Sequence, residues 1–413
     1  MGGGLLSSVL LVARVWNAVT AESRRLRERL VADLERHGLI RSERVREAFL
    51  AVPRELFVPA FAASEGLAAV YRDEAILTRR GEHGVPLSSS SQPAIMALML
   101  EQLELMDGMR VLEVGAGTGY NAALVSLLIG RRGQVVTVDV DGQIAAQARR
   151  ALRHGGYPVR VVHADGRAGF SRAAPYDRIV VTASADAVPW AWFEQLADDG
   201  LLEVPLRLNK GGAQAIPVLC KSRGGFRSLR AVCGGFMPLR GADEDGGGEP
   251  PREPCLVVSD LGRDGRKPLL QLSGAALATL SQTATRRLLV TALGEPRRRR
   301  LGLRADRGAL GLYLSLTLPK SRLVGSFPNF GIGAIGRDGR SLALIELAQP
   351  DRRKIETLKA HGGGEAERFL LERVREWDRR GRPSESNVRI TVTYKGNQSR
   401  LALRWPPVAR EPR

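Results

Sequence analysis

The segment Val111-Leu112-Glu113-Val114-Gly115-Ala116-Gly117-Thr118-Gly119-Tyr120 carries the strongest structural signal in the chain. It runs from a short apolar stretch into three glycines at alternate positions, and helical spacing follows over residues 121–129. Glycine lets the backbone turn sharply and approach a ligand closely. In an open parallel sheet, such a strand–turn–helix unit lies at the crevice where ligands bind. The segment therefore predicts a ligand-binding turn after a buried strand over residues 110–114.

Strand and helix patterns alternate after this segment. We expect strands over 134–138, 159–162 and 178–183, with helices over 143–152 and 191–196. Further strands are expected over 201–205, 215–221 and 227–234, and helices before the glycines over 20–60 and 93–105. Strands that alternate with helices of about 10–15 residues indicate a parallel sheet with crossover helices. The sequence therefore predicts an α/β fold with N-terminal helices.

The length of the chain indicates two domains. A single hydrophobic core rarely grows beyond about 250–300 residues, and this chain has 413. Residues 241–254 are rich in glycine, proline and acidic residues, which is typical of a linker. We therefore expect a catalytic domain over 20–240, a linker over 241–254 and a smaller accessory α+β domain over 255–413.

The expected accessory domain shows mixed patterns and no catalytic motif. Strands are expected over 311–318 and 342–347, the second preceded by a hairpin-type turn at Asp338-Gly339. Residues 365–377 have the spacing of an amphipathic helix, and 388–394 is expected to pair with 401–405. The run Arg297–Arg300 is interpreted as a solvated loop.

The glycine spacing distinguishes between two kinds of cofactor site. A dinucleotide site carries Gly-x-Gly-x-x-Gly or Ala, but position 120 is tyrosine here. With Glu113 two residues before the first glycine, the pattern resembles the S-adenosylmethionine site of Rossmann-like methyltransferases. Asp139 ends the next strand, where a carboxylate can accept both ribose hydroxyls. Asp165-Gly166 follows the third strand and could bind the adenine amino group.

Five stretches over about residues 30–240 resemble the protein-L-isoaspartate O-methyltransferase family, in the family's order. They are residues 51–59 (Ala-Val-Pro-Arg-Glu-Leu-Phe-Val-Pro), 91–93 (Ser-Gln-Pro), 164–169, 174–179 and 200–206. The resemblance implies Ser91 as the active-site residue. It also implies S-adenosylmethionine as cofactor, in a site made of Ser89, Ser90, Glu113, Gly115, Ala116, Gly117, Gly119, Asp139, Val140, Asp165 and Gly166.

The resemblance implies methyl transfer to the α-carboxylate of an isoaspartyl residue, after which the ester collapses to a succinimide. Such chemistry needs no catalytic triad. A carboxylate with a pKa near 4 is already ionised at neutral pH, so no base must remove a proton. The remaining task is to orient the carboxylate oxygen against the methyl group. We expect Ser91 and backbone amides to hold the carboxylate while water is excluded.

The chain departs from the family pattern in two places. Ser-Ser-Ser stands at 89–91, where the family usually has Thr-Ile-Ser, and the chain continues well beyond residue 240. Both features are similar to family members found with ribosomally made peptides, which methylate a normal aspartate. Repair of isoaspartate and tailoring of a dedicated peptide therefore both stay open. We expect residues 255–413 to recruit the peptide partner.

The formal net charge of +18 favours acidic partners. An acidic peptide is one such partner. A nucleic-acid methyltransferase is an alternative, with Arg297–Arg300 as a contact patch. Against it, Thr182-Ala183-Ser184 stands where such enzymes have Asn/Asp-Pro-Pro-Tyr/Phe. Nucleic acid is therefore the less favoured partner.

Cysteine and histidine usage suggests a cytoplasmic protein without a metal. The three cysteines form no Cys-x-x-Cys pair, and the five histidines show no metal-ligand spacing. Such sparse cysteines are typical of a reducing cytosol. The apolar stretch Leu5–Val15 is too short to span a bilayer, so we expect neither a signal nor a membrane segment.

Overall fold

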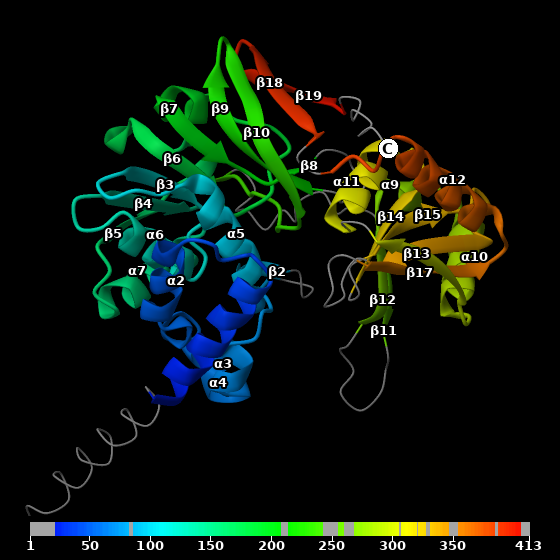
Figure 1. Ribbon diagram of the computed structural model, residues 1–413, viewed down its shortest axis with the longest axis horizontal. Coiled ribbons are helices and arrows are strands. Elements are labelled where there is room, and N and C mark those ends of the chain that lie inside the picture. The colour runs from blue at the N-terminus through cyan, green and yellow to red at the C-terminus, as the bar shows by residue number, and fades with distance from the viewer. Residues whose placement is uncertain are drawn as a thin grey trace, which may run out of the picture. The chain divides into compact units, whose positions relative to one another are not determined.

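The computed structural model describes residues 21–81, 86–207, 214–242, 255–259, 268–304, 307–319, 321–327, 331–346, 354–384 and 387–405 (Figure 1). Most of the expected linker and the stretch Leu5–Val15 lie outside the described residues. Contacts between Cα atoms divide the chain into two compact units.

The two units do not follow the expected domain boundaries. The first unit runs to Thr182 and also takes in Ala191–Glu203 and the segment from Leu239. The second contains Ala183–Trp190 and Val204–Pro238 together with the C-terminal part of the chain. Two strands expected in the catalytic domain thus cluster with C-terminal residues. The expected division into domains over 20–240 and 255–413 with a linker over 241–254 stays a prediction.

Parallel strands form the centre of the first unit. They are β3 (Arg110–Val114), β4 (Gln134–Asp139), β5 (Val159–His163), β6 (Tyr176–Val181) and β7 (Leu196–Glu203), in the spatial order β7-β6-β3-β4-β5. The register sets Val114 beside both Val138 and Val181, so the three central strands end together. The strand order reverses at β3, and ligands bind outside the carboxyl ends of strands at such a reversal. The predicted α/β sheet is confirmed.

Helices flank these strands as expected. The helix α5 (Pro93–Leu103) precedes β3, α6 (Tyr120–Leu128) joins β3 to β4, and α7 (Gly142–His154) joins β4 to β5. The helix α6 buries nearly all its side chains, whereas α7 buries only one stripe: Ile144, Ala145, Ala148 and Leu152. The α7 N-terminus is capped by Asp141, which accepts hydrogen bonds from the backbone of Gln143 and Ile144.

The N-terminal part of the first unit is helical and ends in a hairpin. A helix over 21–36 is followed by α2 (Glu43–Ala51), η1 (Arg54–Phe57), α3 (Pro59–Glu65) and α4 (Leu67–Val70). The hairpin consists of β1 (Ile76–Arg80) and β2 (Pro86–Ser90), with Leu77 paired to Ser89. It carries most of the serine run to the site.

One set of strands in the second unit combines distant parts of the sequence. The strands β8 (Leu206–Arg207), β9 (Gln214–Ser222), β10 (Gly225–Gly234), β18 (Arg389–Lys395) and β19 (Gln398–Arg404) pair antiparallel in that order. The expected pairing of 388–394 with 401–405 is confirmed. Because β10 pairs directly with β18, most of the expected accessory domain is inserted between two neighbouring strands.

The inserted residues form a second, seven-stranded antiparallel sheet. Its order is β11 (Cys255–Ser259), β12 (Pro268–Ser273), β14 (Leu323–Phe327), β15 (Gly331–Ile335), β16 (Ser341–Glu346), β17 (Lys354–Gly362) and β13 (Arg297–Arg304). The expected turn at Asp338-Gly339 joins β15 to β16, and Gly339 supplies the positive φ that it needs.

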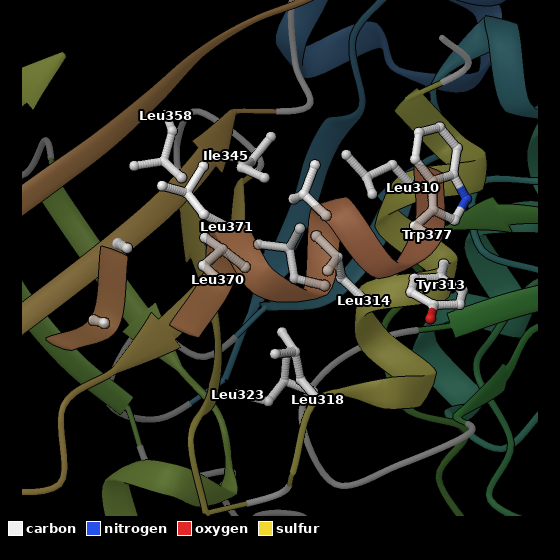
Figure 2. Close-up of a cluster of buried hydrophobic side chains, with 14 of the residues drawn as sticks. Leu310, Tyr313, Leu314, Leu318, Leu323, Ile345, Leu358, Leu370, Leu371 and Trp377 are labelled. Atoms are coloured by element: carbon white, nitrogen blue, oxygen red, sulfur yellow. The ribbon is translucent and has the colours of Figure 1, made fainter. Parts of the chain in front are cut away.

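Helices cover both faces of this sheet. On one face, α11 (Arg307–Thr317) and α12 (Glu365–Arg379) pack in a cluster that includes Ile345 and Leu358 of the sheet (Figure 2). On the other, α9 (Ala275–Ala278) and α10 (Gln282–Leu293) pack against a cluster that includes Leu342 and Leu344. Alternate residues of β16 thus serve two cores, as the two-residue period of a strand requires.

Two expectations about this region are wrong. The expected strand over 311–318 is the helix α11, whose Leu310 and Leu314 lie one turn apart in the buried cluster. A continuous apolar run cannot separate a buried helix from a buried strand by period alone. The run Arg297–Arg300 is not a loop but the start of β13, because its backbone pairs with β17 from Ala360 to Thr357.

Candidate cofactor and active site

The glycine loop after β3 has a backbone that only glycine adopts easily. Gly115, Gly117 and Gly119 have φ angles of 99°, 49° and 90°. A Cβ atom on Gly115 would lie 2.5 Å from the Oγ1 of Thr182 at the end of β6. The amides of Gly115 and Ala116 donate to the carbonyl of Val138 at 2.8 and 3.1 Å. The loop is therefore held against the carboxyl ends of β4 and β6.

Asp139 lies beside this loop. Its Oδ2 accepts a hydrogen bond from the amide of Gly117 at 3.1 Å, and its Oδ1 accepts one from Asp141 at 3.1 Å. Burial raises the pKa of Asp139, although these two backbone bonds oppose the shift. The structure thus brings the predicted ribose-binding acid to the glycine loop. The next residue, Val140, is buried, and its carbonyl contacts the His163 ring at 2.9 Å.

Glu113 is placed differently from the other predicted site residues. It is fully buried, and its two oxygens accept hydrogen bonds from Asn121 at 2.8 Å and Thr137 at 2.5 Å. Burial raises its pKa to about 7, against the effect of both bonds. The carboxyl group therefore joins β3 to β4 and α6 beneath the loop.

Asp165 is engaged by its own neighbours. Arg167 donates to both carboxylate oxygens, with its Nη2 2.7 Å from Oδ2, and the amide of Ala242 donates to Oδ2 at 3.1 Å. Burial alone would raise the pKa of Asp165, but these bonds lower it overall. Gly166 accepts a hydrogen bond from the indole of Trp192 at 2.8 Å. A Cβ there would lie 2.4 Å from Val114, so this turn also packs tightly.

The serine run lies next to the glycine loop. Ser88 and Ser90 are buried, whereas Ser89 and Ser91 are half-buried. A Cβ on Gly117 would lie 3.3 Å from the carbonyl oxygen of Ser89, so the loop and β2 approach each other closely. The structure therefore brings together Ser89, Gly117 and Asp139 from three separate segments.

An ion pair links the β1–β2 hairpin to the loop after β4. The Arg79 Nη1 lies 2.9 Å from both carboxylate oxygens of Asp141, the residue that caps α7. Asp141 in turn donates its amide to Asp139. The hairpin that carries Ser89 is thus tied to the predicted ribose-binding acid through two contacts.

Arg54 is the main residue that the sequence analysis did not assign to the site. Its side chain is fully buried, and burial lowers its pKa. It donates to the carbonyls of Val70, Arg72, Glu74, Ser90 and Ser91 and to the Ser90 hydroxyl. The bond to Ser91 measures 3.0 Å. The only sequence signal for a role of Arg54 was its place in residues 51–59, one of the stretches that resemble the family.

A small buried network supports Arg54. The Tyr71 hydroxyl donates to Glu55 and accepts the amide of Arg54 at 3.2 Å. Ser23 also donates to Glu55. Burial, followed by the Glu55 charge, raises the pKa of Tyr71. The first helix, η1 and α4 are therefore joined directly behind the serine run.

The described residues contain no group of three or more histidine, cysteine, aspartate or glutamate side chains placed to hold a metal ion. None of the described helices has the length and apolar character needed to cross a membrane. Cys220 is a free thiol.

Comparison with known proteins identifies relatives of the first part of the chain. A family model described as protein-L-isoaspartate(D-aspartate) O-methyltransferase matches residues 24–242. The protein-L-isoaspartate O-methyltransferase of Methanothermobacter thermautotrophicus is 38% identical over 52% of this chain and 95% of the relative. That of Pyrobaculum arsenaticum is 40% identical over 52% and 99%.

A solved structure extends the similarity to the C-terminal part. It is titled protein-L-isoaspartate O-methyltransferase and matches with a TM-score of 0.51 at 26% identity. The match covers 91% of this chain and 99% of that chain. Most of the region beyond residue 242 therefore also has a structural counterpart.

Proposed function

Because the chain belongs to the protein-L-isoaspartate(D-aspartate) O-methyltransferase family, we propose that it methylates the α-carboxylate of isoaspartyl residues in a protein or peptide. S-adenosylmethionine is the methyl donor. The observation that carries the proposal is that Gly117 lies against both Asp139 and the carbonyl of Ser89. The family match favours this activity over the nucleic-acid methyltransferase that composition left open.

The residues at the carboxyl ends of the strands suit the cofactor. When bound, S-adenosylmethionine supplies a methyl group that the positive sulfonium makes electrophilic. We assign Gly115, Ala116, Gly117 and Gly119 to its amino acid end, because such small residues let a ligand approach the backbone closely. Asp139 would accept the ribose hydroxyls, with Val140 beside it.

Two of the acids take modified roles in this proposal. Glu113 uses both oxygens inside the protein, so we assign it to positioning the loop rather than to touching the cofactor. Asp165 is already paired with Arg167. We propose that this ion pair and Gly166 together lie against the adenine end of the cofactor. A free Asp165 carboxylate alone does not form this part of the site.

Ser91 and its neighbours would hold the substrate carboxylate. Because that carboxylate is ionised at neutral pH, the protein's task is to orient one oxygen toward the methyl group. The Ser91 hydroxyl can donate a hydrogen bond, and Arg54 fixes the Ser91 backbone from behind. Ser89 and Ser90 would line the boundary between cofactor and substrate, with Ser90 held by Arg54.

The substrate is the finer part of the proposal. Isoaspartate in damaged proteins and aspartate in a dedicated peptide carry the same reacting group in different backbone settings. The net charge of +18 supports an acidic partner for either. The sparse cysteines, none of them in a Cys-x-x-Cys pair, support a reducing cytoplasm as the compartment.

The test is methyl transfer from labelled S-adenosylmethionine to two matched peptides, one with isoaspartate and one with aspartate. We expect base-labile label on the isoaspartyl peptide. Label on the aspartyl peptide alone would assign the enzyme to peptide tailoring. Absence of label from both, with cofactor binding intact in calorimetry, would contradict the proposal for simple substrates.

Two serine substitutions distinguish an effect on catalysis from a general loss of stability. Ser91→Ala should lower kcat about 10- to 100-fold, because a poorly oriented carboxylate reacts slowly, while cofactor affinity stays unchanged. The matched control is Ser64→Ala, since Ser64 is exposed on α3 and bonds only the local carbonyl of Phe61. Equal kcat values for the two variants would show that Ser91 does not orient the substrate carboxylate.

A further inference from the structure

The strand β13 forms one end of the seven-stranded sheet. Its single strand partner among the described residues is β17, so its other edge carries backbone N–H and C=O groups that no described strand pairs. Such an edge is a template for another strand. Most edges are protected by a cover or by charge, and β13 begins with Arg297, Arg298, Arg299 and Arg300, all exposed.

The four arginines divide between the two faces of the sheet. Arg297 and Arg299 pair across the sheet with Ala360 and Leu358, on the face covered by α12. On that face both approach Glu367 of α12, at 3.4 and 3.5 Å. Their charge is therefore partly neutralised.

Arg298 and Arg300 point to the opposite face, where the charge is not neutralised. Arg298 lies across from Lys359 and Arg300 from Thr357. Lys359 has its own partner, Glu346. Within the described part of the chain, neither Arg298 nor Arg300 has an ion-pair partner. A strand added to this edge would meet two unneutralised positive charges along one face.

The charge selects what can occupy the edge. A second copy of this chain would bring the same arginines against each other, and like charges on adjacent strands destabilise pairing. A neutral strand gains nothing from the arginines. An acidic strand gains both main-chain hydrogen bonds and ion pairs, so the same charges that repel most strands attract this one.

We propose that the free edge of β13 binds an acidic, extended polypeptide segment, with carboxylates at alternate positions facing Arg298 and Arg300. The inference rests on the proposed function only in taking the partner to be a protein or peptide. A nucleic acid fits less well, because phosphates accept hydrogen bonds but offer no donors for the free carbonyl groups of a strand edge.

The test uses the full chain and a fluorescent eight-residue peptide that alternates Glu and Thr, read by anisotropy. We expect binding that salt weakens, and a loss of about tenfold or more in affinity for the R298E/R300E variant. The matched control is R24E/R25E, which reverses two exposed arginines on the first helix. That variant should keep the affinity.

Two further probes separate strand pairing from charge alone. A block peptide with four Glu followed by four Thr has the same charge but only two carboxylates on each face, so it should bind more weakly. The alternating peptide with every backbone amide methylated should not bind. Equal binding of all three peptides, or an equal loss in both charge-reversal variants, would overturn the proposal.

A single-stranded oligonucleotide of equal charge completes the design. Tighter binding of the oligonucleotide than of the alternating peptide, abolished by R298E/R300E, would assign the edge to nucleic acid and overturn the proposal. Methyl transfer to the short isoaspartyl peptide is measured in parallel and should be unchanged in R298E/R300E. Failure of that transfer in the wild-type protein would count against the proposed function and not against the docking edge.

Discussion

The parallel strands β3 to β6 and the antiparallel sheet β11 to β17 differ in how well the sequence predicts them. In the first region every expected strand lies within a few residues of its place. In the second, residues 311–318 proved helical and residues 297–300 formed a strand. The first region has local signals, namely glycine turns and alternating strand and helix periods. In the second, the pairing of β13 with β17 overrides a composition poor in strand-forming residues.

The two regions also differ in how their charged groups are held. Around the glycine loop, charged groups such as Arg54 and Glu113 are fully buried and hydrogen-bonded. In β13 the arginines are exposed. Substitutions should therefore be costly for stability in the first region and nearly neutral in the second, where only partner binding should change.

The largest effect is expected from Arg54→Met. It removes a buried cation from several carbonyl groups, including those of Ser90 and Ser91, and leaves them without a donor. We expect the free energy of unfolding to fall by about 3 kcal/mol or more, measured by urea denaturation. Arg24→Met, on the exposed face of the first helix, is the control. A loss of the same size in both variants would show that burial of Arg54 contributes little.

The next effect concerns pH and Glu113. Its folded-state pKa of about 7 lies above the ordinary value of 4.5. The neutral acid therefore stabilises the fold below about pH 4.5, and this contribution is lost as the pH rises through about 7. Relative to Glu113→Gln, the wild-type protein should lose about 3 kcal/mol between pH 4 and pH 8. Parallel stability curves for the two proteins across this range would contradict the assignment.

A smaller effect is expected from Gly115→Ala. The substitution strains a φ of 99° and places a Cβ 2.5 Å from Thr182, so the loop must move. We expect the affinity for S-adenosylmethionine to fall about 10- to 100-fold, since such strain costs about 1–3 kcal/mol. Gly108→Ala is the control, because it has a φ of 85° and no atom within 4 Å of its Cβ. It should lose stability without losing cofactor affinity.

The smallest effect is expected from R298E/R300E on stability. Exposed charges away from special contacts change the free energy of unfolding by less than about 0.5 kcal/mol. Thermal unfolding of this variant and of the wild-type protein should therefore nearly coincide. A large drop would mean that the arginines stabilise the sheet, and the contrast between the two regions would fail.

Much of the candidate site was predictable, and the reasons are local. The glycines, Asp139 and Asp165 follow strands directly, and parallel strands bring such positions to one edge. The sequence could not show that Glu113 lies beneath the loop, because a strand residue's face depends on its neighbours. Nor could it show that Arg54 holds Ser91, since 37 positions separate them.

The amino-acid sequence alone was sufficient for the α/β class, the glycine loop and the family, because these depend on short motifs and on hydrophobic period. Tertiary structure was needed for everything that depends on pairing between distant residues. In the folded chain, β10 pairs with β18 across the inserted sheet, and the arginine run is an edge strand. Ser89, Gly117 and Asp139 lie together although they are distant in sequence. Hydrogen bonds between such segments form only once the chain has folded, so no local pattern records them.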